Sequence, residues 1–137
     1  MNTQSDIPNQ TMEFDLDVLA LVPDLFFASR IDAVATSMGK SLLVVRSQSD
    51  FDRALDEHHP RLILIDLGAR GIDAESAIHA GKRFGTARLM VFGPHLDVSA
   101  RAAALGAGAD HWVTNQRLVE TLAAELRGER GNTHSEE

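Results

Sequence analysis

Asp66 is the residue of this sequence whose position most directly indicates chemistry. It follows four consecutive apolar residues, 62–65, and precedes a short segment that contains Gly68 and Gly71. A carboxylate at the end of a buried strand can serve as a nucleophile or a ligand at the mouth of a site. It can equally be the polar residue that ends the strand by accepting hydrogen bonds from nearby backbone N–H groups.

Other residue types give weaker chemical signals. The chain has no cysteine, which excludes disulfides, thiolate metal sites and thiol nucleophiles. Its six histidines include no pair at the i, i+4 spacing of a helical metal motif. No Ser-His-Asp arrangement and no nucleophile elbow can be assembled. We therefore expect no metal site and no enzymatic activity.

Charge and hydropathy limit the classes of partner. The 137 residues carry a formal net charge of −7 and no run of lysines or arginines, which argues against direct nucleic-acid binding. No apolar run reaches the ~18 residues of a membrane span, and the N-terminus lacks the basic start and apolar middle of a secretory signal. These features predict a cytoplasmic protein.

Strand and helix patterns alternate along the chain. Short apolar runs predict five strands, at 15–22, 41–45, 61–66, 88–92 and 111–114. Amphipathic spacing predicts a helix after each strand, with apolar stripes that include Phe27 and Ile31 in the first and Leu118 and Leu122 in the last. The expected helix starts are Ser49 or Asp50 for the second helix, Asp73 for the third, and Asp97 or Ser99 for the fourth; Pro60 and Gly85 are expected to end the second and third.

This pattern predicts one α/β domain. The strands are apolar without period-two alternation, which is typical of parallel strands covered on both faces. The expected architecture is a doubly wound sheet in three layers, with sites outside the carboxyl ends of the strands, where Asp66 lies. We assign residues 14–127 to the domain, and 1–13 and 128–137 to flexible tails, because the terminal segments are polar and aperiodic.

Two segments resemble the response-regulator receiver (CheY-like) family. LILIDLGARGIDA is similar to the family's third-strand signature, in which Asp-Leu, two variable residues and Pro-Gly follow the strand. LGAGADHWVTN is similar to the stretch that leads through the fifth strand to the family's lysine. The resemblance covers roughly residues 17–126. It implies a flavodoxin-like (βα)5 fold with a parallel five-stranded sheet in the order 2-1-3-4-5.

The resemblance also implies a phosphoryl-transfer site. Asp66 falls on the phosphoacceptor position, and the backbone carbonyl of Gly68 is a remaining ligand for magnesium. The two acids expected at the end of strand one are replaced by Val22 and Pro23, with Asp24 one residue beyond.

The other positions depart from the family as well. Gly93 stands where a Thr or Ser hydroxyl is expected, and Asn115 stands where a lysine is expected. Arg70 replaces the proline of the signature. Because phosphoryl transfer depends on a metal ion and on positioned charges, these losses predict a degenerate pocket.

The predicted function is a pseudo-receiver, a signal-transduction module that works through protein contacts without phosphorylation. Two alternatives are a working phosphorelay receiver of a two-component system, phosphorylated on Asp66 with Mg²⁺ as cofactor, and a small-molecule sensor. Otherwise we expect no cofactor. The expected partners are a kinase, a regulator or an output protein, and the chain is either a stand-alone receiver or an excised domain.

Trp112 occupies the position of the family's switch aromatic. Receivers commonly dimerise or dock partners through the face of the fourth helix, the fifth strand and the fifth helix. We therefore expect Trp112 to be either a core residue or part of such an interface, which would also allow a homodimer.

Overall fold

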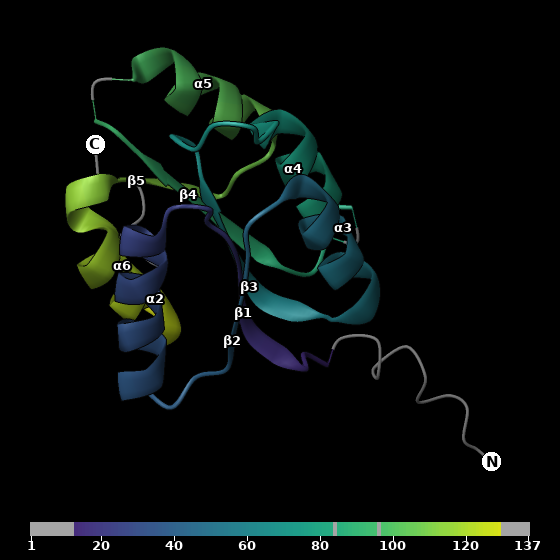
Figure 1. The fold of residues 1–137 in the computed structure, drawn as a ribbon, viewed down its shortest axis with the longest axis vertical. Helices are drawn as coiled ribbons and strands as arrows, with labels where there is room; N and C mark the ends of the chain where they lie inside the picture. Colours follow the sequence, from purple (N-terminus) through teal and green to yellow (C-terminus); the bar gives the residue numbers. More distant parts are fainter. Residues whose placement is uncertain (1–12, 84, 96, 130–137) are drawn as a thin grey trace.

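A computed structural model describes residues 13–83, 85–95 and 97–129. Its strands are β1 (Leu16–Leu21), β2 (Leu42–Val45), β3 (Pro60–Asp66), β4 (Arg88–Gly93) and β5 (His111–Thr114). Its helices are α2 (Leu25–Ser37), α3 (Gln48–Glu57), α4 (Ala74–Gly81), α5 (Val98–Ala107), the 3-10 turn η2 (Asn115–Arg117) and α6 (Leu118–Leu126). The strands are parallel and lie in the order β2-β1-β3-β4-β5 (Figure 1), which confirms the predicted fold.

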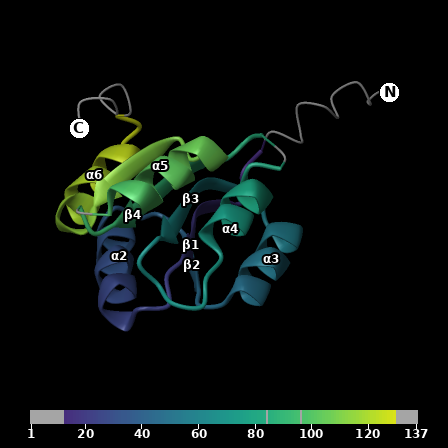
Figure 2. The same ribbon diagram turned by 90° about the horizontal axis from the view of Figure 1, so that it is seen from above.

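Helices cover both faces of the sheet. Figures 1 and 2 show α2 and α6 on one face and α3, α4 and α5 on the other. The central strand β3 serves both layers, because Leu62 and Leu64 pack towards α2 and α6 while Ile63 and Ile65 pack towards the other three helices. Both faces of β3 are therefore apolar, which explains the continuous apolar run before Asp66.

Short polar side chains begin four of the helices. Asp73 and Asp97 cap α4 and α5, as predicted. The prediction for α3 is wrong, because its N-cap is Ser47, whose hydroxyl accepts a hydrogen bond from the N–H of Asp50 at 3.1 Å. The stretch 47–50 offers three cap-forming residues, and the first of them, two positions after the end of β2, is the one that caps the helix.

Two other predicted bounds also shift. Helix α3 ends at Glu57, and Pro60 is the first residue of β3 instead of the helix terminator. Proline is tolerated there because the first residue of a strand need not donate to the ladder. Helix α4 ends at Gly81, before the predicted Gly85, and Phe84 lies outside the described residues. The predicted tails, apart from Glu13, Gly128 and Glu129, also lie outside them.

Both described ends of the chain lie at the amino-terminal edge of the sheet. Asp15 fixes the entry to β1, since its carboxylate accepts a hydrogen bond from the His59 N–H at 2.6 Å. Helix α6 runs back from β5, and its Glu125 contacts Arg88 and His111, the first residues of β4 and β5. The carboxyl edge, where the strands lead into their loops, is therefore at the other end of the molecule.

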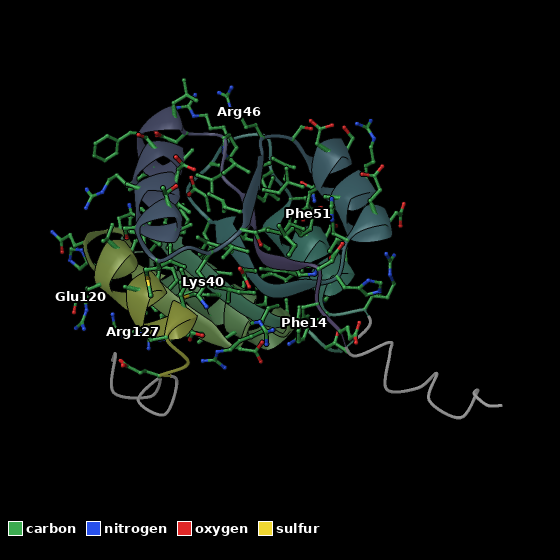
Figure 3. All side chains as sticks on the ribbon, turned by 90° about the horizontal axis from the view of Figure 1, so that it is seen from below. Phe14, Lys40, Arg46, Phe51, Glu120 and Arg127 are labelled. Carbon is green, nitrogen blue, oxygen red and sulfur yellow. The ribbon has the colours of Figure 1, made fainter. Side chains whose placement is uncertain are left out.

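Individual side chains can be assigned to the core or to one of the two edges of the sheet. In Figure 3, Phe51 points from α3 into the core, whereas Arg46 and Lys40 lie at opposite ends of α2. Arg46 donates to the backbone carbonyl of Pro23 through Nε and Nη2, at 3.1 and 3.0 Å, and so braces the loop between β1 and α2. No helix within the described ranges is both long and apolar enough to span a membrane.

Candidate functional site

Asp66 is the last residue of β3 and is paired in the sheet with Phe92 of β4. Its side chain is buried, with 5% of the residue exposed. Oδ1 accepts a hydrogen bond from the Gly68 N–H at 2.9 Å. Burial raises the pKa of the Asp66 carboxyl, and the negative charge of Asp24 raises it further, while the Gly68 hydrogen bond acts in the opposite direction.

A cavity of about 440 Å³ opens beside this carboxylate at the carboxyl edge of the sheet. The loops after β1, β3, β4 and β5 all contribute to it, as expected for a doubly wound sheet. Its lining residues are Pro23, Asp24, Phe27, Asp66, Gly68, Ala69, Arg70, Pro94 and Asn115. The structure thus brings together most of the predicted pocket residues, but Val22, Gly93 and Trp112 do not line the cavity.

The end of β1 supplies little to this cavity. Val22 is fully buried in the core under α2 and α6 and does not line the cavity. Pro23 lines the cavity but offers no side-chain oxygen. Asp24 caps α2, with Oδ1 accepting from the N–H groups of Phe26 at 2.7 Å and Phe27 at 3.4 Å. One of its oxygens is therefore already committed to the helix start.

The end of β4 is closed by an aromatic ring. A Cβ atom added at Gly93 would lie 3.2 Å from Cζ3 and 3.3 Å from Cη2 of Trp112, and 3.3 Å from the Cβ of Leu67. Trp112 itself is 7% exposed and packs in the core beneath α3, α4 and α5. The indole therefore occupies the space into which a side chain at residue 93 would extend.

Asn115 lies at the end of β5, where it begins the η2 turn. Its Oδ1 atom is buried and has no hydrogen-bond partner among the described residues. An unpaired buried acceptor is unfavourable, and it favours a donor brought by a ligand or a water molecule. Asn115 therefore adds a neutral acceptor to the cavity where a cationic side chain would add donors.

The side chains at this edge offer few ligands for magnesium. Magnesium requires near-octahedral coordination by hard oxygen ligands, usually with carboxylates that are free to bind it. Asp24 and Asp66 are the two acids in the cavity, and each already accepts backbone hydrogen bonds. Throughout residues 13–83, 85–95 and 97–129, no three His, Asp or Glu side chains converge in a metal-binding arrangement.

Sequence reasoning missed two features of the cavity. Phe27 was assigned only to the apolar stripe of its helix, yet its ring also lines the cavity and packs edge-to-face against Phe92, with centroids 5.3 Å apart. Pro94, which the sequence analysis did not consider for the site, also forms part of the wall. Position gave a signal for Pro94, which follows directly after the carboxyl end of β4, whereas Phe27 lies in the first turn of α2.

A second polar cluster, also missed, lies at the opposite edge of the sheet. Glu125 accepts hydrogen bonds from Arg88 Nε at 2.8 and 3.0 Å, and its Oε2 lies 3.3 Å from Nδ1 of His111. Burial alone would raise the pKa of Glu125, but the hydrogen bonds and charges of His111 and Arg88 hold it below its usual value. Only 7% of Glu125 is exposed, so this cluster ties α6 to β4 and β5 from within.

Comparison with known proteins finds relatives that are similar in sequence. No family model matches the chain. It is 29% identical over 116 residues to transcriptional regulatory protein KdpE of Mycobacterium tuberculosis, in strains CDC 1551 and H37Rv, and the match covers 84% of this chain. The chain spans about half the length of these curated relatives, 50% in each case.

Comparison with solved structures finds proteins that have a similar fold. A response regulator from Burkholderia pseudomallei with a phosphorylated aspartic acid superposes with a TM-score of 0.76 and 18% identity, over 88% of this chain and 70% of that one. A signal receiver domain from Pseudomonas fluorescens gives 0.74 and 14%, over 88% and 90% of the two chains. The beryllofluoride-activated NtrC4 receiver domain dimer gives 0.71 and 16%, over 88% and 98%. The chain thus has the fold of these response-regulator receiver domains.

Proposed function

We propose that this chain is a receiver-like signal-transduction module that acts through protein contacts without a phosphorylation cycle. The observation that carries the proposal is the surroundings of Asp66. Its carboxylate lies at the expected end of β3, but a buried valine follows β1, β4 ends in a glycine covered by Trp112, and an asparagine follows β5.

The chemistry of phosphoryl transfer supports this proposal. Transfer to a carboxylate requires that the charge spread over the phosphoryl oxygens be neutralised by a metal ion and fixed cations. Asp24 and Asp66 place like charges in one cavity, and the nearest described cation of its lining, Arg70, makes no ion pair with either of them. Burial raises the pKa of Asp66 and the charge of Asp24 raises it further, so a second negative group beside this carboxylate is unfavourable.

An exposed apolar row on α5 supports contact with other proteins. Val98, Ala102 and Leu105 follow the i, i+4, i+7 spacing of one helix face, and Val98 and Leu105 are 67% and 40% exposed. Helix α5 is one element of the face formed by α5, β5 and α6, the fourth helix, fifth strand and fifth helix of the chain. The similar NtrC4 receiver was solved as a dimer. The proposed partner of this face is a kinase, a regulator, an output protein or, in a homodimer, a second copy of the chain.

Two other functions remain as alternatives, each with one supporting observation. Phosphorylation of Asp66 is supported by its place at the carboxyl end of β3 and by the phosphorylated aspartic acid of the Burkholderia relative. Small-molecule sensing is supported by the cavity of about 440 Å³ beside Asp66. The first alternative requires a metal ion that the described side chains fit poorly.

Incubation with acetyl phosphate and magnesium, followed by intact mass measurement, tests the proposal. We expect no stoichiometric addition of a phosphoryl group, because the charge of the incoming group is not neutralised. The Asp66→Asn variant serves as the matched control for modification elsewhere. A phosphoryl adduct on the unmodified chain that is absent from Asp66→Asn would overturn the proposal in favour of the working receiver. A magnesium titration of Trp112 fluorescence gives a second readout, and no saturable response is expected.

A further inference from the structure

Hydrogen-bond acceptors without donors characterise the cavity beside Asp66. Asp66 is 5% exposed, and although its Oδ1 accepts from Gly68, its Oδ2 has no partner among the described residues. Oδ1 of Asn115 is buried and likewise unpaired within the described part of the chain. Because buried acceptors are costly when unpaired, the cavity is suited to a ligand that donates hydrogen bonds.

The charges of the lining favour a cation. Asp24 and Asp66 contribute two carboxylates, against the single guanidinium of Arg70. Arg70 is an exposed residue that forms no ion pair with either acid. The pKa of Asp66 is raised by burial and by the charge of Asp24, and an added positive charge would relieve both effects.

The remaining lining is apolar and partly aromatic. Pro23 and Pro94 form walls, and the ring of Phe27 is held in place by its edge-to-face contact with Phe92. An aromatic face attracts a cation, while prolines and rings accommodate methylene groups. The volume of about 440 Å³ is within the range, about 300–1,000 Å³, of small-ligand sites.

We propose that this cavity binds a primary ammonium group carried on a short aliphatic chain. The three N–H donors of an ammonium meet the free oxygen of Asp66, Oδ1 of Asn115 and the carboxylate of Asp24. The aliphatic chain lies along Phe27 and the two prolines. An anion would meet two carboxylates, and among the described residues no three His, Asp or Glu side chains converge to hold a divalent metal ion.

This chemistry has two sources, a lysine side chain of a partner protein and a free alkylamine. Either one deepens the proposed function, because it makes the carboxyl edge a site for recognition instead of phosphoryl transfer. The inference rests on the proposed function in one respect only: Asp66 must remain an unmodified carboxylate.

Amide chemical shifts of the full chain provide the test. Titration with n-butylamine hydrochloride is expected to produce saturable shifts at Asp24, Phe27, Gly68, Ala69 and Asn115, which line the cavity. n-Butanol, which has the same chain without the charge, and sodium chloride at equal ionic strength are expected to produce none. The absence of saturable shifts with n-butylamine, or equal shifts with n-butanol, would overturn the inference.

Variants that remove a negative or a positive charge from the cavity extend this test. Asp66→Asn removes the charge and is expected to weaken n-butylammonium binding about ten-fold. Arg70→Ala removes the competing cation and is expected to tighten it. Asp52→Asn removes an exposed charge on α3, outside the cavity, and is expected to leave binding unchanged.

If Asp66→Asn fails to fold, Asn115→Ala provides the second measurement, since it removes an acceptor and is also expected to weaken binding. Unchanged binding in a folded Asp66→Asn, or in Asn115→Ala where Asp66→Asn does not fold, would overturn the inference. Tighter binding of an Nα-acetyl-lysine methylamide than of n-butylamine assigns a partner's lysine, and the reverse order assigns a free amine. Treatment with acetyl phosphate is scored separately, so phosphorylation of Asp66 contradicts the proposed function while absent amine binding contradicts this inference.

Discussion

The indole ring of Trp112 lies against the backbone of Gly93, so closely that a Cβ at residue 93 would be 3.2 Å from Cζ3 of the ring. The two residues face each other across the pairing of β4 and β5 and are two positions apart in register, since Trp112 pairs with Val91 and Gly93 with Thr114. The missing side chain at one position and the large ring at the other are therefore parts of one packing arrangement.

Substitution of Gly93 by alanine is expected to destabilise the fold. The added methyl group must displace Trp112 or Leu67, and overpacking of this kind typically costs about 1–3 kcal/mol. Urea denaturation gives the free energy of unfolding.

Gly106→Ala is the matched control, because Gly106 lies within α5 with open space around its position, and alanine is favoured over glycine in helices by about 0.5–1 kcal/mol. In a Trp112→Leu background, which is itself destabilised by truncation of a core residue, the additional cost of Gly93→Ala should be smaller, because the smaller side chain leaves room for the methyl group. Equal stability of Gly93→Ala and Gly106→Ala would contradict the packing account.

Asp66 is expected to lower stability at neutral pH. Its native pKa is raised above the ordinary value of 3.8, so the native state binds more protons than the unfolded state between these two pKa values. The free energy of unfolding therefore falls as pH rises through that window. Asp66→Asn keeps an acceptor for the Gly68 N–H and should be more stable than the unmodified chain at pH 7, with the difference lost below about pH 3.8. Thermal melts of both proteins at several pH values measure the difference, and a less stable variant at neutral pH would be the contrary result.

Glu125 is expected to show the opposite dependence on pH. Hydrogen bonds from His111 and Arg88 outweigh burial and lower its pKa below the ordinary value of 4.5, so its stabilising contribution is present above that value and is lost as pH falls through the native pKa. Glu125→Ala leaves the Arg88 guanidinium buried without its partner and should cost about 3–5 kcal/mol at pH 7.

Glu120→Ala on the same helix is the comparison, because its pairing with Arg117 is exposed and is expected to contribute less than about 1 kcal/mol. Chemical denaturation of both variants at pH 7 measures the contrast. Similar losses in the two variants would show that the buried cluster does not hold α6.

Leu105→Glu is expected to abolish self-association if two copies meet through α5. Leu105 is 40% exposed and lies on the apolar row with Val98 and Ala102, so a charge there would be desolvated in the interface. Sedimentation equilibrium measures the mass. Phe26→Glu, at the exposed start of α2, is the control and should not alter the mass. If the unmodified protein and Leu105→Glu both self-associate while Phe26→Glu is monomeric, the interface does not lie on α5.

The fold and the location of the site were predictable because they depend on local patterns. The apolar run before Asp66 follows from a strand that serves both core layers, and the alternation of elements then fixes a parallel sheet. The cavity contains Asp24, Asp66, Gly68 and Asn115 because the carboxyl ends of neighbouring parallel strands meet at one edge.

What the sequence could not predict depends on side-chain direction and on pairs distant along the chain. Whether Trp112 packs inward or outward depends on its rotamer, and its contact with Gly93 depends on the register of β4 and β5. Glu125 follows Leu118 and Leu122 on the buried face of α6, but a search for apolar spacing passes over a glutamate. Its partner Arg88 is 37 positions away, and only the folded sheet brings the two together.

Because residues 13 and 129 both lie beside the amino ends of the strands, the molecule can be anchored by either one without obstructing the cavity. A chain that is coupled to a surface or labelled with a fluorophore near either residue would expose the carboxyl edge of its sheet to the solution. Binding experiments on immobilised protein therefore sample the loops after β1, β3, β4 and β5 directly, whichever attachment is chosen.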